Sequence, residues 1–186
     1  MTQSRPKVTG LAKENTVPED ENLEWLADTY WYVPPENLLA LRAVNTAEPV
    51  VRSLSDQTVW HITASESGYL TGISATNIGR GWNYMLMVGS VSPDGVVKIS
   101  FAPLGAANPD DPTTQSMTIG DGTLMADGDD VAFSMQMTSG TAQSSVTHWA
   151  YMLPVTQDDP EWSSLPGYPD TGIADLTGLQ TPIRLD

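Results

Sequence analysis

Apolar and polar side chains alternate with a period of two through most of the chain after Leu38, and this alternation limits the fold more than any other feature. Residues 131–138 are a clear case, because valine, phenylalanine and two methionines alternate there with smaller or polar residues. Successive side chains of a β-strand point to opposite faces of a sheet, so the pattern predicts strands. Turn-forming residues such as Ser92-Pro93-Asp94-Gly95 separate the segments, and short turns join antiparallel neighbours. We therefore expect a mostly antiparallel β fold.

The alternating segments number about eight. They are residues 38–45, 57–63, 68–77, 82–91, 95–102, 114–119, 122–127 together with 131–138, and 144–154. We expect a mainly β fold, a roughly eight-stranded antiparallel β-barrel of the calycin or lipocalin type, because closure leaves no exposed strand edge. A barrel of this size is either filled by side chains or holds one small ligand. A filled sandwich or barrel under a covering helix is the alternative.

An amphipathic helix is expected before the barrel, at about residues 17–31. Thr16 and Glu19 have the spacing of a capping box, and Pro34-Pro35 would end the helix. The acidic residues near its start fit the positive end of the helix dipole. They also fit a lid that pairs with basic residues on the barrel rim, for which the candidates are Arg42, Arg52, Arg80 and Lys98. In the lid interpretation, deleting residues 1–26 should cost more activity than stability. The lid residues are Glu19, Glu21, Trp25 and Leu26.

The chain is expected to form one domain with three parts. These are an arm and lid helix at 1–35, a barrel at 36–154 and a Pro- and Gly-rich C-terminal wrap at 155–186. The net charge of −15 opposes binding to nucleic acid and to anionic membrane surfaces. The chain has no cysteine, no secretory signal and no apolar run of the ~18 residues that a membrane helix needs. We therefore expect a cytoplasmic protein.

No standard catalytic or metal-binding motif is present. His61 and His148 lie far apart in sequence, inside expected strands, and two histidines without a spaced carboxylate are a poor metal signature. Each is expected to be a hydrogen-bonded core or rim residue, or else an acid, base or donor in a cavity. Aspartates near residues 121–130 are best explained by turn chemistry rather than calcium binding. We expect no metal and no cofactor.

Gln115 follows a loop and begins an expected strand, which places it near a barrel mouth. A neutral amide there could donate a hydrogen bond to a ligand carbonyl without the desolvation cost of a charge. A solvent-facing strand residue is the competing interpretation.

A cysteine-free barrel with an apolar, aromatic interior and a preceding amphipathic segment resembles the small β-barrel [4+2] cyclases (Diels–Alderases) of polyketide natural-product and antibiotic biosynthesis. Those enzymes form spirotetronate and spirotetramate ring systems. The resemblance lies in residues 19–26, 58–63, 82–87 and 114–117, and it would cover roughly 17–154.

The resemblance implies a cofactor-independent enzyme that folds a linear, apolar polyene so that diene and dienophile meet. In that role, hydrogen bonds to the dienophile carbonyl would come from Gln115 and Tyr84, with His148 as a weaker candidate. The interior would be shaped by Trp60, Trp82, Met135 and Trp149. Trp25 and Leu26 would plug the mouth. Period-two reasoning does not fix which strand face is inside.

Three other functions fit the same sequence. A lipocalin-like carrier would share the cavity but show no turnover. Another barrel cyclase, isomerase or dehydratase would need a general acid or base, for which His61 or His148 is the natural choice. A partner-binding module could dock through its acidic, tryptophan-rich segment. An aromatic outer face is also compatible with a homodimer.

Overall fold

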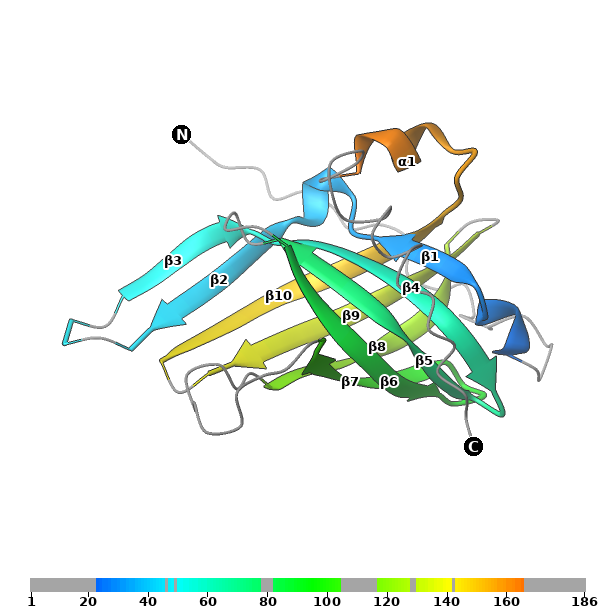
Figure 1. The fold of residues 1–186 in the computed structure, drawn as a ribbon, viewed down its shortest axis with the longest axis horizontal. Helices are drawn as coiled ribbons and strands as arrows, with labels where there is room; N and C mark the ends of the chain where they lie inside the picture. Colours follow the sequence, from blue (N-terminus) through cyan, green and yellow to red (C-terminus); the bar gives the residue numbers. More distant parts are fainter. Residues whose placement is uncertain are drawn as a thin grey trace, which may run out of the picture.

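The computed structural model describes residues 23–45, 47–48, 50–77, 82–104, 117–127, 130–141 and 143–165. These residues form one ten-stranded antiparallel sheet with three short helical segments (Figure 1). The strands are β1 (Thr29–Tyr32), β2 (Leu39–Val44), β3 (Val50–Ser55), β4 (Gln57–Glu66), β5 (Tyr69–Asn77), β6 (Trp82–Val91), β7 (Val96–Pro103), β8 (Met117–Asp127), β9 (Asp130–Gly140) and β10 (Ser144–Val155). The helical segments are η1 (Leu23–Leu26), η2 (Pro35–Asn37) and α1 (Pro160–Ser164).

Eight of the strands close into a barrel, as the alternation predicted. From β4 to β10 each strand pairs with the next along the chain, and β1 joins the two ends because it pairs with both β4 and β10. The turn at Ser92–Gly95 also forms as expected, with the amide of Gly95 donating to the Ser92 carbonyl and Gly95 at φ 80°. The mainly β barrel is therefore confirmed.

The β2–β3 hairpin lies outside this barrel and projects from it, on the left of Figure 1. Strand β10 is long enough to have two neighbours along one edge: residues 144–148 pair with β2, whereas residues 153–155 pair with β1. The expected segment 38–45 is β2, but β3 was not anticipated. Segments 114–119 and 122–127 proved to be parts of a single strand, β8, with the residues before Met117 outside the described ones.

The barrel interior is filled with side chains along most of its length. The interior cluster takes alternate residues from every barrel strand, including Trp31, Trp60, Met87, Phe133 and Met135, none of which is exposed. The rings of Trp31 and Trp60 lie 4.5 and 5.6 Å from that of Phe133, measured between centroids. Such contacts are typical of close-packed cores, so the described residues fill the interior as a core over this length.

The expected helix at residues 17–31 is wrong for the part that the structure describes. Residues 23–26 make only a 3-10 turn, and Thr29–Tyr32 is strand β1. The sequence there also alternates: Trp31 points inward, while Tyr30 and Tyr32 pack on the outer cluster. Pairing with β4 and β10 satisfies the backbone groups of Thr29–Tyr32 and places Trp31 in the interior. Residues 1–22 lie outside the described ones.

Residues 155–165, the described start of the C-terminal segment, cover part of the outer face of the barrel. Trp162 and Leu165, in and just after α1, pack with outward-facing residues of β1, β4, β5 and β10 in a second apolar cluster. This explains why strands such as β4 are apolar on both faces. No helix within the described ranges has the length and apolar character needed to cross a membrane.

Candidate functional site

A pocket of about 220 Å³ opens at one end of the barrel, here called the mouth pocket. Its lining residues come from β2, β5, β6, β8, β9 and β10 and from adjoining turns: Arg42, Asp56, Thr76, Asn83, Met85, Thr118, Ser139, Thr141, Ser144 and Val146. The topology explains the hollow. At this end β10 pairs with β2 rather than β1, and β2 continues into β3 instead of meeting β4.

The inner face near the mouth is polar, whereas the opposite end of the barrel is apolar. Six inner-face side-chain atoms near the mouth are buried and have no hydrogen-bond partner among the described residues. They are Arg42 Nε, Asp56 Oδ1, Thr58 Oγ1, Trp60 Nε1, Ser74 Oγ and His148 Nδ1. Buried polar groups normally have a partner, because leaving one unpaired costs about 1–3 kcal/mol. Their concentration here marks the mouth as the place where water or a ligand supplies the missing partners.

Asp56 and His148 form the titratable centre of the mouth. His148 Nε2 lies 3.5 Å from Asp56 Oδ2, and both side chains are almost fully buried. Burial raises the pKa of Asp56 to about 7, against a smaller opposite effect of the Thr58 hydroxyl. Burial also lowers the pKa of His148 to about 4. A neutral imidazole therefore faces a carboxyl group that can either give or take a proton near neutral pH.

The three residues expected to donate hydrogen bonds do not come together. His148 lies on the inner face beside the mouth pocket, a position that fits both a core histidine and an acid or base in a cavity. Tyr84 is opposite Ala75 and packs on the outer cluster, so the expectation that it faces the cavity is wrong. The reason is the alternation of side chains along β6: the side chain of Met85, the next residue, points inward, so that of Tyr84 points outward. Gln115 lies outside the described residues.

Of the four residues expected to shape the interior, two lie inside the barrel, one lies outside it, and one has a side chain that is not described. Trp60 and Met135 are fully buried in the interior cluster. Trp149 is on the outer face with 64% of its surface exposed, so its expected place in the interior is wrong. It alternates with His148 and Ala150, which occupy the inner face. The side chain of Trp82 is not among those the structure describes.

The expected lid is a fixed plug in its described part. Leu26 is fully buried, Leu23 nearly so, and both belong to the interior cluster at the end opposite the mouth. Ser65 of β4 donates to the Leu23 carbonyl at 2.8 Å and so ties η1 to the barrel. Trp25 is 39% exposed and contacts Trp31 from outside. Glu19 and Glu21 lie outside the described residues.

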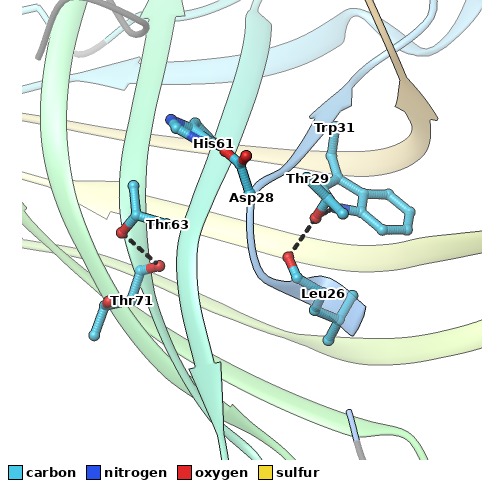
Figure 2. Close-up of polar contacts among 7 residues, drawn as sticks. All are labelled: Leu26, Asp28, Thr29, Trp31, His61, Thr63 and Thr71. Atoms are coloured by element: carbon cyan, nitrogen blue, oxygen red, sulfur yellow. Dashed lines mark hydrogen bonds and ion pairs between the residues drawn. The ribbon is translucent and has the colours of Figure 1, made fainter. Parts of the chain in front are cut away.

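His61 belongs to a separate structural contact on the outer face. Its Nε2 lies 3.0 Å from Asp28 Oδ1, and the ring of Tyr30 stacks on it with centroids 4.1 Å apart. Trp162 of α1 packs edge-on against Tyr30. Figure 2 shows Asp28 next to His61, in the turn that leads from Leu26 to Thr29. This arrangement joins β1 and the turn before it to β4 and α1, and it agrees with the expectation of a hydrogen-bonded core histidine.

Nearby, Thr29 Oγ1 donates to the Leu26 carbonyl at 2.6 Å and accepts from Trp31 Nε1 at 2.8 Å (Figure 2). These bonds fix the direction in which the chain leaves η1 for β1.

Sequence reasoning missed Asp56 and Ser74 and considered Arg42 only as a partner for the lid. Asp56 lies between β3 and β4, where an aspartate ordinarily indicates an exposed turn. No local pattern separates Asp56 from an ordinary turn residue, because its burial, which continues through residues 57–62, is visible only in the folded chain. Within the described part of the chain, no group of three or more His, Asp or Glu side chains could hold a metal ion.

Comparison with known proteins adds no assignment. A scan against models of protein families found no match, and searches of curated proteins and of solved structures found none either.

Proposed function

We propose that this protein is a cofactor-independent [4+2] cyclase. In this proposal the mouth pocket holds the polar tetramate or tetronate head of a linear polyene and brings its diene and dienophile together to form a spiro-linked cyclohexene. The observation that carries the proposal is the group of unpartnered polar atoms on the inner face, directly above an apolar interior. A ligand with several carbonyl groups at one end and a hydrocarbon chain at the other complements that distribution.

The chemistry needed is modest. A cycloaddition requires near-attack geometry, and holding the reacting groups can supply roughly 7–11 kcal/mol in well-oriented cases. A hydrogen bond to the dienophile carbonyl adds to this, because charge develops there in the transition state. Trp60 Nε1 and Ser74 Oγ are suitable donors, since the two residues are opposite each other across β4 and β5 and neither atom has a partner among the described residues.

The size of the pocket fits the head better than the whole substrate. Pockets for drug-sized ligands usually measure about 300–1,000 Å³, whereas the mouth pocket holds about 220 Å³. The methionines on the inner face are unbranched and can rotate to other rotamers, so the interior below the pocket can yield to a chain.

Product analysis with a linear polyene carrying a tetramate head tests this proposal. The expected product is an isomer of unchanged mass and altered retention. Trp60→Phe keeps a ring in place but removes the indole N–H, and Ser74→Ala removes the hydroxyl; each should lower kcat about tenfold or more. Trp149→Phe, on the outer face, is the matched control and should leave kcat unchanged. Binding without conversion would instead indicate a carrier.

A second candidate function is favoured by the Asp56–His148 pair. An isomerase or a different cyclase could use Asp56 as the general base and His148 to orient it, because a carboxyl group with a pKa near 7 exchanges protons efficiently at neutral pH. Turnover in D2O separates the two reactions. A cycloaddition leaves the carbon-bound hydrogens in place, whereas proton transfer through Asp56 would introduce deuterium above the level of an enzyme-free control.

A further inference from the structure

Arg42 is a half-buried cation that lines the mouth pocket, and none of the ion pairs among the described residues involves it. The chain has only eight Lys and Arg residues against 23 Asp and Glu residues, yet Arg42 Nε is buried without a hydrogen-bond partner among the described residues. Asp56 lines the same pocket, but among the described residues no ion pair joins Asp56 to Arg42. The titratable side chain that lies next to Asp56 is that of His148. A buried N–H of a guanidinium group normally has an acceptor beside it, so Arg42 Nε can receive an anion that enters the pocket.

The groups around Asp56 show how an anion could be accommodated. Arg42 approaches from β2 and His148 from β10, while Arg52 of β3 is the cross-strand neighbour of Arg42. The lining residues contributed by β5, β6, β8 and β9 carry no charge. An incoming anion therefore meets one positive charge at Arg42, and it meets a repelling negative charge only when Asp56 is ionised.

We infer that the mouth pocket takes up an anionic head group together with one proton, the anion lying against Arg42 and the proton being held by Asp56 and His148. This rests on the proposed function, because it assumes that the pocket is the ligand site, and it specifies the ligand class as an enolate or another delocalised oxyanion. Protonation of Asp56 removes the repulsion and leaves a donor for the ligand oxygen. The two side chains together take up the proton, as coupled groups do.

Isothermal titration calorimetry of the full chain with 3-acetyltetramic acid tests the inference, since this probe is ionised throughout the range from pH 6 to pH 8. With the pKa of free Asp56 at about 7, the apparent Kd should rise about tenfold from pH 6 to pH 8. Titration at pH 8 in two buffers of different ionisation enthalpy should show uptake of nearly one proton per ligand bound. The O-methyl ether of the probe is neutral, and its binding should not depend on pH.

Two variants separate the contributions. Asp56→Asn should bind the anion with a Kd that is flat from pH 6 to pH 8, and Arg42→Gln should weaken binding of the anion more than tenfold while affecting the ether less. If Asp56→Asn does not fold, proton uptake by the unaltered protein decides the question.

Binding of the anion with a Kd that does not change with pH and without proton uptake would overturn the inference. The proposal that the mouth pocket holds the head of the substrate would then still stand. If the probe does not bind at any pH, both the inference and the proposal that the mouth pocket holds the head of the substrate are wrong. Product analysis with the linear polyene then tests cyclase activity separately. A folded Asp56→Asn variant that keeps the pH dependence would also overturn the inference.

Discussion

Asp56 and His148 make opposite contributions to the pH dependence of stability. The pKa of Asp56 rises on folding from 3.8 to about 7, so between these values the folded state holds a proton that the unfolded state lacks, and stability falls as pH rises. The pKa of His148 falls on folding from 6.5 to about 4, so between these values the unfolded state holds the extra proton, and stability rises with pH. From about pH 4 to 6.5 the two slopes, each about 1.4 kcal/mol per pH unit, oppose each other.

Removing either group should therefore expose the slope of the other. In Asp56→Asn, the free energy of unfolding should fall as pH drops from 6.5 to 4, because protonation of His148 in the unfolded state is no longer offset by Asp56. In His148→Gln, the free energy of unfolding should fall as pH rises from 4 to 7, because ionisation of Asp56 in the unfolded state is no longer offset by His148. Urea unfolding at half-unit pH steps measures both. Parallel curves for the two variants would contradict the assignment.

At the scale of elements, η1 and the β2–β3 hairpin determine the two ends of the barrel. Leu23 and Leu26 fill the closed end, where Ser65 holds η1 in place. At the other end the hairpin draws β2 away from β4 and leaves the mouth pocket open. Segment η1 thus lies at the end of the barrel opposite the pocket, and it contributes to stability rather than to opening or closing the pocket.

Leu26→Ala should destabilise the protein by about 2–5 kcal/mol, because a fully buried side chain would be replaced by a cavity. Trp25→Ala, one residue away on the exposed side, should cost about 1 kcal/mol or less. Binding of the tetramate probe should be the same in both variants once they are folded. Chemical unfolding followed by circular dichroism measures the free energies of unfolding of the two variants. A larger loss of stability in Trp25→Ala than in Leu26→Ala would contradict the role of Leu26 as a plug.

At the scale of the whole molecule, the barrel is closed by its shortest strand. Four-residue β1 lies between β4 and β10 and pairs with both, so it connects the first and last strands of the meander. Without it, β4 and β10 would each expose an unpaired edge, and Trp60 would lose Trp31, its cross-strand neighbour on the inner face.

Truncation tests this closure. A chain lacking residues 1–22 keeps η1 and β1 and should unfold in one cooperative transition. A chain lacking residues 1–32 loses the plug and the closing strand, and it should lose cooperative unfolding and aggregate. Size-exclusion chromatography and thermal unfolding distinguish the two. A monomeric, cooperatively unfolding product of the longer deletion would show that β1 is dispensable.

The sequence by itself determined the class of fold and every strand except β1 and β3, because alternation and turn chemistry are local properties. Segments such as 82–91 and 144–154 appear in the structure almost as expected. Local signals failed at residues 23–32, where apolar spacing fitted a helix equally well and only pairing with β4 and β10 made Thr29–Tyr32 a strand.

The tertiary structure alone decided which face of each strand is inside and what meets at the mouth. A period of two cannot distinguish the faces, so His148 and Trp149, adjacent in sequence, were both assigned to the interior although only His148 lies there. Arg42, Asp56 and His148 come from three separate parts of the chain, and barrel closure brings them to one end. The perturbed pKa values of Asp56 and His148 arise from the burial that this closure imposes, which no local pattern encodes.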